Sequence, residues 1–283
     1  MKAKYFVFLI LTPFLIQSCN NNEFDNNLDD LTNSEIMNRL NIDDASVWNT
    51  LVNQNIDLSF VETSAMKSAN AIQEYPNGNK YYFAMFEDLY PSEGDYDFND
   101  IIIKSKLGLS KKGNVITGYL KSELVNKGGS LPVEIGLMFY EVSGKKYSRI
   151  PNENITVNGE QLVKGEGPWT IPYSQLGKSW QIDFQFTNKS NNIWIAYHIV
   201  TKSEILTGGF APTDVTNFEI PHKHFLNKNN LPWGLEIEAE KFAIPNEKEL
   251  FLNAYPQFKE WAESGGVKNK KWFENPDLEY THY

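Results

Sequence analysis

Short apolar or alternating segments, separated by small and polar residues, fill most of the chain after residue 80. The breaks between them are rich in glycine, asparagine, serine and lysine, and several tolerate the positive φ that hairpin turns need. Many short strands with short turns predict a mainly β domain, an antiparallel β-sandwich or jelly roll. The segments are 81–86, 101–107, 115–124, 133–142, 155–157, 179–187, 193–201 and 235–237, and the breaks are 111–114, 126–129, 143–145 and 188–192.

Helical patterns occur near both ends of the chain. Residues 34–40 form one, with Asn33 or Ser34 suited to cap its first turn, and a weaker one covers 45–53. The clearest helix is expected at 256–264, where two aromatic residues three apart share a face and a Gly-Gly pair follows. We therefore expect a small N-terminal helical segment and a short C-terminal helix beside the β domain.

The first nineteen residues have the pattern of an export signal. Lys2 and Lys4 precede an apolar run over 5–16, which is too short to span a membrane as a helix. The single cysteine of the chain, Cys19, follows Ser18 where a lipoprotein signal would be cut. This arrangement resembles a bacterial lipobox, which implies acylation of Cys19 and an exported outer-membrane lipoprotein, with exposure at the cell surface left open. The alternative is an ordinary secretory signal with a cysteine there by chance.

These patterns divide the chain into four parts: a signal peptide at 1–18, an Asn- and Asp-rich tether at 19–30, a partly helical segment at 31–79 and a β domain at 80–283. With 41% hydrophobic and 14% aromatic residues among 283, the chain can bury a core without disulfides. Its net charge of −10 argues against nucleic acid or anionic lipid as a partner, and is compatible with divalent cations.

The densest acidic stretch, 87–100, carries the clearest candidate chemistry. Asp95, Asp97 and Asn99 reproduce the first three ligand positions of an EF-hand loop, but Asp100 stands where that motif needs Gly and Lys106 where it needs Glu. The stretch is therefore no EF-hand, yet its hard oxygen donors and crowded carboxylates favour a structural calcium ion. The predicted ligands are Asp95, Asp97, Asn99 and Asp100, with Glu87 or Asp88 completing the set.

Geometry adds a condition to the calcium prediction. Residues two apart on a straight strand lie about 6.6 Å apart, whereas ligands of one calcium lie at most about 5 Å from each other. Residues 94–100 must therefore curl as a loop before the strand at 101–103 begins. The alternative is a solvated turn whose carboxylates face water or cap backbone N–H groups.

Other residues support further, weaker hypotheses about function. Two of the acidic residues facing a cleft would suit a glycan- or peptide-processing hydrolase. His222 and His224 would face one way on a strand and could hold zinc with an acidic ligand, although a surface pair is the plainer reading. His198 is expected to pack within a strand. By residue type alone, the candidates for stacking on a sugar are Trp169, Tyr173, Trp194, Tyr197 and Trp233, but most large aromatic residues are expected in the core.

Two stretches resemble the LruC-domain proteins, a family also known as DUF4842. The run 85–101, which reads MFEDLYPSEGDYDFNDI, is similar to the FEDLWP and GDYDFND signature of that family, with Tyr90 in place of the usual Trp. The second stretch comprises NNLPWGLEI at 229–237 and AYPQFKEWAESGG at 254–266. The resemblance covers about 80–283, although the middle, 107–228, offers no clear alignment.

The resemblance implies an exported, often lipidated, mainly β domain without an established enzymatic activity. Together with the residues, it predicts a non-enzymatic, lipid-anchored binding or structural protein with a calcium-stabilised loop over 94–100. A glycan or an envelope protein is the expected class of partner. A surface hydrolase and a metal-free structural subunit of a surface assembly remain as alternatives.

Overall fold

The computed structural model describes residues 31–42, 56–57, 72–129, 131–143, 146–150, 155–161, 169–172, 179–187, 192–201, 204–207 and 225–283. Residues Thr32–Tyr283 form one compact unit. The signal sequence with Cys19, the tether, the helix expected at 45–53, and His222 with His224 lie outside the described residues and stay predictions. Within these described ranges, no helix is long and apolar enough to cross a membrane.

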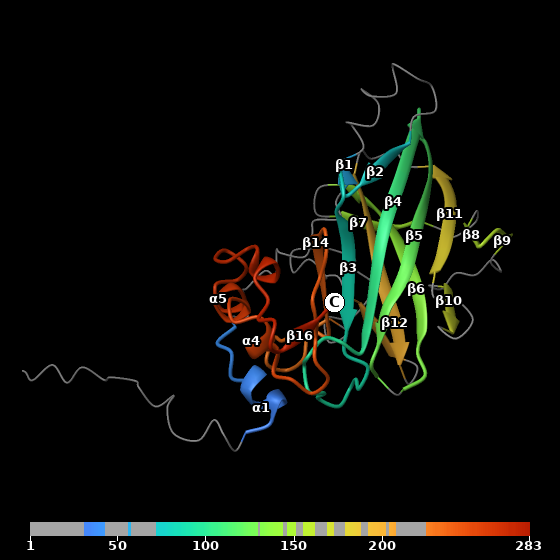
Figure 1. Cartoon of the computed structure of the whole chain (residues 1–283). Coiled ribbons are helices and arrows are strands. Elements are labelled where there is room, and N and C mark those ends of the chain that lie inside the picture. Colours follow the sequence, from blue (N-terminus) through green and yellow to red (C-terminus); the bar gives the residue numbers. More distant parts are fainter. Residues whose placement is uncertain are drawn as a thin grey trace, which may run out of the picture. The chain divides into compact units, whose positions relative to one another are not determined.

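The larger sheet has eight strands and contains the longest hairpin of the fold (Figure 1). Strand β2 (Gln73–Tyr75) pairs with β4 beside the main path. That path runs β14 (Gly234–Ala239), β3 (Tyr81–Phe86), β4 (Ile101–Lys112), β5 (Val115–Lys127), β11 (Ser179–Thr187), β8 (Ile155–Val157) and β9 (Glu160–Gln161).

The second sheet has six strands, and the strands described in both sheets pair antiparallel. Its path runs β1 (Ile56–Asp57), β12 (Asn192–Thr201), β6 (Glu134–Ser143) and β10 (Trp169–Pro172), with β13 (Glu204–Thr207) beside β12 and β7 (Lys146–Arg149) beside β6. A separate two-stranded ribbon joins β15 (Ile244–Pro245) to β16 (Thr281–His282).

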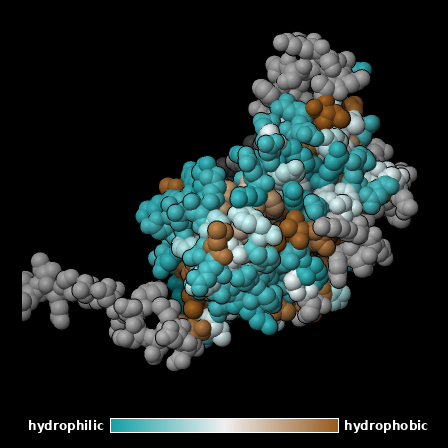
Figure 2. All heavy atoms as spheres, in the orientation of Figure 1, coloured by the Kyte–Doolittle hydropathy of each residue, from teal (hydrophilic) through white to brown (hydrophobic). Residues whose placement is uncertain are grey.

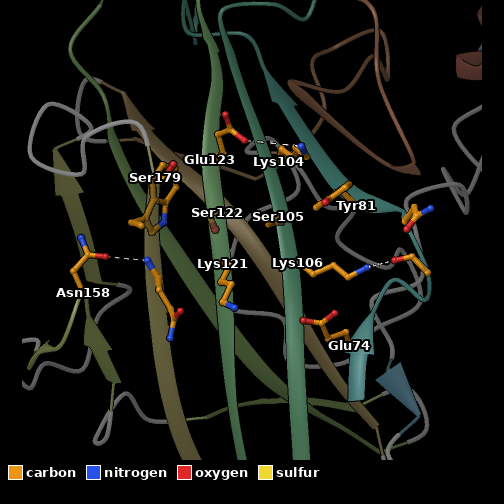
Figure 3. Close-up of a pocket in the computed structure, with 14 residues that line it drawn as sticks. Glu74, Tyr81, Lys104, Ser105, Lys106, Lys121, Ser122, Glu123, Asn158 and Ser179 are labelled. Atoms are coloured by element: carbon orange, nitrogen blue, oxygen red, sulfur yellow. Dashed lines mark hydrogen bonds and ion pairs between the residues drawn. The ribbon is translucent and has the colours of Figure 1, made fainter. Parts of the chain in front are cut away.

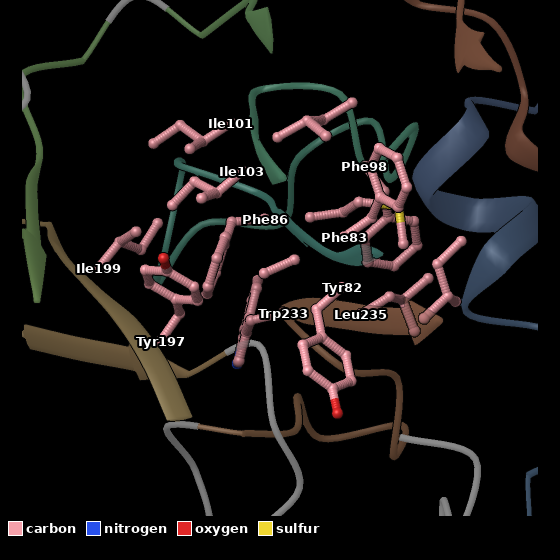
Figure 4. Close-up of a cluster of buried hydrophobic side chains, with 14 of the residues drawn as sticks. Tyr82, Phe83, Phe86, Phe98, Ile101, Ile103, Tyr197, Ile199, Trp233 and Leu235 are labelled. Carbon is pink, nitrogen blue, oxygen red and sulfur yellow. The ribbon is translucent and has the colours of Figure 1, made fainter. Parts of the chain in front are cut away.

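Aromatic and aliphatic side chains fill the space between the two sheets. The ring of Phe139 on β6 lies 4.8 Å from that of Phe184 and 5.8 Å from that of Phe186, both on β11. Tyr197 on β12 shares a hydroxyl–hydroxyl hydrogen bond with Ser122 on β5. Figure 4 shows Tyr197 and Ile199 of the smaller sheet beside Phe86 and Ile103 of the larger. The predicted antiparallel β-sandwich is confirmed.

The apolar segments mark the strands well, but two of the four expected turns are not hairpins. The break at 111–114 closes the β4–β5 hairpin with Gly113 at φ 59°, and the break at 143–145 joins the paired strands β6 and β7. The strands that flank the breaks at 126–129 and 188–192, β5 with β6 and β11 with β12, instead belong to different sheets. A run of polar and small residues suits both kinds of connection, so composition does not distinguish them.

The helices differ from expectation at their ends. Helix α1 (Asn33–Met37) begins one residue early because Thr32 caps it, with Glu35 completing a capping box, so the expected caps Asn33 and Ser34 are wrong. The C-terminal helix α5 (Phe258–Glu263) starts two residues after Pro256, where the helix was expected to begin. Helix α4 (Phe251–Ala254) and the 3-10 turn η3 (Trp272–Glu274) were not expected.

The C-terminal elements enclose an aromatic cluster of their own. Helices α4 and α5 lie on the β14 side of the larger sheet (Figure 1). Trp272 packs within 5.7 Å, centroid to centroid, of Phe251, Tyr255, Phe258 and Trp261. Hydrophilic residues cover most of the described part of the face drawn in Figure 2, with hydrophobic residues only in scattered places. The apolar side chains are therefore used mainly inside, as the sequence pattern predicts.

Candidate metal centre

Residues 87–100, which we call the acidic loop, connect β3 to β4 without regular strand structure. Tyr96 and Phe98 have φ values of 53° and 54°, a left-handed conformation that is uncommon for bulky residues. The predicted curl at 94–100 is therefore confirmed. Such conformations persist only where the surrounding structure holds them in place.

Two aromatic anchors hold the acidic loop. The ring of Tyr96 stacks on Trp233 with centroids 5.9 Å apart, and Asn227 Nδ2 donates to its hydroxyl at 2.7 Å. Phe98 meets Phe251 at 5.0 Å between ring centroids, inside the C-terminal aromatic cluster. Tyr96 and Phe98 are both fully buried. Because these two aromatic residues alternate with acidic ones, their rings pack in the core while the carboxylates between them lie close together.

Three carboxylates converge within the acidic loop. One oxygen from each of Glu87, Asp95 and Asp97 lies within 4.8 Å of the other two. This spacing falls within the range for ligands of one calcium ion, whose oxygens lie at most about 5 Å apart. Glu87 and Asp97 are buried, while Asp95 is partly exposed. We call these three residues the carboxylate triad.

Glu87 also organises the loop around itself. The backbone N–H of Phe98 donates to Glu87 Oε1 at 2.7 Å, and that of Tyr96 donates to Oε2 at 3.2 Å. Each oxygen keeps lone-pair capacity for a further partner. Gly94 permits this approach, because a Cβ at that position would lie 2.5 Å from Glu87 Oε2.

Asp97 ties the loop to the distant C-terminal segment. The backbone N–H of Lys248 donates to Asp97 Oδ2 at 2.9 Å, and Asn99 Nδ2 donates both to this oxygen at 2.9 Å and to the carbonyl of Pro245 at 3.2 Å. A segment more than a hundred residues away therefore completes the environment of the triad. Local sequence reasoning had no signal for this contact.

Asp88 and Asp100 lie together beside the triad. The backbone N–H of Asp88 donates to Asp100 Oδ2 at 2.9 Å, and that of Leu131 donates to Asp88 Oδ2 at 3.2 Å. Oxygens of both carboxylates crowd the position that a Cβ on Gly129 would take. The six predicted ligands thus occupy one region, but the structure groups only Glu87, Asp95 and Asp97 at metal-ligand spacing.

Asn99 presents a polar atom without a partner. Both hydrogen-bond partners of its Nδ2 are acceptors, which fixes the orientation of the amide. Its Oδ1 is buried and, among the described residues, receives no hydrogen bond. That oxygen faces Gly128, whose Cβ position lies 2.9 Å from Asn99 Oδ1 and 3.3 Å from an oxygen of Glu247. Glu247, which sequence reasoning missed, is thereby placed at the edge of the acidic region.

The electrostatics of the region disfavour its full ionisation. Burial, followed by the charges of Asp100, Asp97 and Asp95, raises the pKa of Glu87 well above its ordinary value. Burial, followed by the charge of Asp95, raises the pKa of Asp97 to about 7. Burial likewise raises the pKa of Asp100 to about 7, with Asp88, Asp95 and Glu247 adding to the effect. Ionised carboxylates here require a positive charge beside them.

No such charge comes from the described part of the protein. None of the ion pairs found among the described residues involves Glu87, Asp95, Asp97 or Asp100. Asp95 lines a surface pocket of about 370 Å³ together with residues of the α1 region, so solvent reaches the triad from that side. The arrangement can accept a small cation from solvent and hold it by buried carboxylates.

The other candidate residues lie elsewhere. His198 is fully buried in β12, as expected for a packed strand residue. Trp194, Tyr197 and Trp233 are buried as well, so they cannot stack on a ligand, while the side chains of Trp169 and Tyr173 lie outside the described ones. Trp233 meets Tyr90 edge to face at 5.1 Å, which brings the two stretches that resemble LruC-domain proteins into contact.

The second of these stretches lies within a region that matches a known family model. The model of DUF4842, a domain of unknown function, matches residues 170–273. The expected resemblance is confirmed. The DUF4842 match includes β12, β14 and both C-terminal helices, whereas the acidic loop precedes it.

A solved structure of a putative lipoprotein from Bacteroides ovatus is 14% identical, with 76% of this chain and 77% of that chain covered and a TM-score of 0.47. No curated protein matches the chain.

Proposed function

We propose that the protein is a lipid-anchored binding module of the bacterial envelope whose acidic loop holds a structural calcium ion. The observation that carries the calcium assignment is the carboxylate triad, with two of its three members buried and all three oxygens at ligand spacing. Asn99 Oδ1, which has no hydrogen-bond partner within the described part of the chain, is a further oxygen that could coordinate a cation directly or through water. Cys19 would carry the anchor that the lipobox implies, and the lipoprotein description of the Bacteroides ovatus structure agrees with it.

A structural role for the ion follows from the position of the acidic loop. The loop touches the larger sheet through Glu87, the C-terminal segment through Asp97, and the aromatic cluster through Phe98. An ion that neutralises the triad would remove repulsion at the junction of these three parts. Calcium would therefore stabilise the whole domain rather than one surface loop.

Burial also weighs against the hydrolase alternative. A glycosidase places a substrate between two accessible carboxyl groups. Glu87 and Asp97 are at most 1% exposed, and backbone N–H groups occupy part of their hydrogen-bonding capacity. A sugar ring has no route between them, so we propose a non-enzymatic function.

Thermal unfolding of a chain that begins at residue 20 tests the calcium assignment, because the compact unit starts only at Thr32. A ligand at about 100 times its Kd adds about 2.7 kcal/mol of stability. At about 2–4 °C per kcal/mol for a domain of this size, calcium should raise the Tm by about 5–10 °C over chelator. Asp97→Asn should abolish most of this shift, whereas Glu240→Gln, an exposed site beyond the far end of β14, should retain it.

Equal melting temperatures in calcium and in chelator would contradict the calcium site. The hypothesis of a metal-free structural subunit would then be favoured. A shift that survives in Asp97→Asn would place the ion outside the carboxylate triad.

A further inference from the structure

An open groove crosses the outer face of the larger sheet, away from the acidic loop. It encloses about 770 Å³, within the range of small-molecule sites, and its lining comes from β2, β3, β4, β5, β11 and the turn after β8 (Figure 3). From β3 to β8 the sheet makes four inter-strand steps, which at about 4.8 Å each give a length of about 19 Å. The groove suits an extended ligand lying across the strands.

The side chains of the groove are held in place by one another. Lys106 Nζ donates to the carbonyls of Pro76, Gly78 and Lys80 at 2.6, 2.7 and 2.9 Å, which fixes the turn that forms one wall. Lys104 Nζ lies 4.1 Å from the centre of the Tyr81 ring. Little conformational freedom would be lost when a ligand binds to groups fixed in this way.

The opposite wall is fixed as well. Asn158, in the turn after β8, accepts a hydrogen bond from the backbone N–H of Gln181 through its Oδ1 at 2.9 Å, and its own N–H donates to the Gln181 carbonyl at 2.8 Å. These two bonds dock the turn onto β11. Gln181 lines the groove between this wall and Lys121 on β5, the residue opposite it in the sheet.

A flat aromatic surface adjoins the groove. The ring of Tyr119 on β5 lies over Gly108 on β4, where any Cβ would run into the ring. Glu74, a groove residue, accepts a hydrogen bond from the Tyr119 hydroxyl at 2.6 Å, and Lys121 Nζ lies 4.6 Å from the ring centre. Apolar ring surface and polar groups are thus adjacent along one face.

The mixture of groups restricts the class of ligand. Three lysines and two glutamates line the groove with serine, asparagine and glutamine, so the lining mixes donors and acceptors without a dominant charge. A polyanion would also meet a protein with a net charge of −10. An extended peptide normally pairs with a free strand edge, but β3, β4, β5 and β11 each have neighbours on both sides.

An uncharged chain of hydroxyl groups fits these conditions, since each hydroxyl both donates and accepts. Its apolar C–H faces can lie against aromatic rings. From this geometry we infer that the groove binds an oligosaccharide. The inference rests on the proposed binding role at the envelope and names the partner class, but it uses none of the calcium ligands.

Calorimetry on the chain from residue 20 tests the inference, in calcium buffer. The probes are the uncharged maltohexaose, cellohexaose and xylohexaose, with hexagalacturonate as a polyanionic comparison and an uncharged serine- and threonine-rich peptide as a second one. At least one uncharged saccharide should bind saturably, and the double variant Lys121→Ala/Gln181→Ala should weaken its binding by about tenfold or more. Lys112→Ala, at the exposed end of β4 outside the groove lining, is the matched control and should bind like the unaltered chain.

The inference would be overturned if none of the uncharged saccharides bound saturably, if the double variant kept its affinity, or if only the peptide or only hexagalacturonate bound. The melting test with calcium and chelator on the same samples separates the two proposals. A double variant that keeps its calcium shift but loses saccharide binding supports the groove. A missing calcium shift would contradict only the calcium site, because the groove uses none of the calcium ligands.

Discussion

Glu87 is the residue on which the acidic loop depends. Its carboxylate accepts two backbone N–H groups from the loop and lies at ligand spacing from Asp95 and Asp97. A fully buried carboxylate of this kind is costly unless it is hydrogen-bonded and its charge is balanced. Its two N–H donors provide the first condition, and the proposed ion would provide the second.

Gly94→Ala tests how closely the loop wraps Glu87. The added methyl group would displace Glu87 Oε2, so we expect calcium affinity to fall by about 10- to 100-fold, as for loss of a group that orients a ligand. Gly159→Ala is the control, because its φ of 84° strains the backbone by about 1–2 kcal/mol far from the loop. Calorimetric titration should show a normal affinity in that control. Equal calcium affinity in both variants would mean that Glu87 is not a ligand.

The pH dependence of stability should report the titration of the triad. Folding raises the pKa of Asp97 from 3.8 to about 7, so the folded chain binds its proton more tightly than the unfolded chain does. The metal-free domain should therefore lose stability as pH rises from about 4 to about 7. Calcium binds the ionised carboxylates, so the rise in Tm that it causes should grow over the same interval.

Melting curves in chelator and in calcium between about pH 5 and about pH 8 check this dependence. Asp97→Asn lacks one titrating group and should show a flatter profile in chelator. A metal-free Tm that increases with pH over this interval would contradict the predicted direction.

At the scale of elements, the acidic loop and the C-terminal helices stabilise each other. Phe98 belongs to the loop by sequence and to the aromatic cluster by contact, since its ring meets Phe251 on α4 and Phe258 on α5. The helices are only four and six residues long, so their stability comes from this packing and not from helix propensity. Loosening either partner should therefore loosen both.

Phe98→Ala measures this dependence. Removing a fully buried ring should cost about 3–5 kcal/mol of unfolding free energy in urea, and should also lower calcium affinity because the loop loses its anchor. Val115→Ala, at an exposed position of β5, should change stability by no more than about 0.5 kcal/mol. A cost below about 1 kcal/mol for Phe98→Ala would show that the loop is held by other contacts.

At the scale of the whole molecule, the proposed anchor and the two proposed sites have separate roles. The acidic loop lies where β3 meets β4, and the saccharide groove crosses the outer face of the same sheet. Calcium would stiffen the sheet that presents the groove, while the tether and lipid would keep the domain at the membrane. Binding and anchoring should then be separable by mutation.

Cys19→Ser tests the anchor. The unaltered protein expressed in a Gram-negative host should sediment with membranes and incorporate labelled palmitate, because acylation adds about 0.8 kcal/mol of membrane affinity per buried methylene. The variant should incorporate no label and appear in the soluble fraction. Removal of the anchor should leave the calcium-dependent Tm unchanged. Palmitate incorporation into the variant would contradict lipidation at Cys19.

Local patterns in the sequence determined most of the strands. The bounds of β3, β8 and β11 agree with the apolar segments, because alternation and turn residues are properties of neighbouring positions. The curl at 94–100 was expected from the sequence only on the condition that these residues bind one calcium ion, whose ligand spacing excludes a straight strand. The resemblance to DUF4842 followed from two stretches of consecutive residues.

Tertiary structure alone decided which distant groups meet. The bond from Lys248 to Asp97 and that from Asn99 to Pro245 join positions separated by 151 and 146 residues, and no local pattern encodes such pairings. The same holds for the turns at 126–129 and 188–192, whose composition is the same whether a chain reverses or changes sheet. Residue types supplied the carboxylates, but only packing of the whole chain buried them together, because burial depends on every element that covers them.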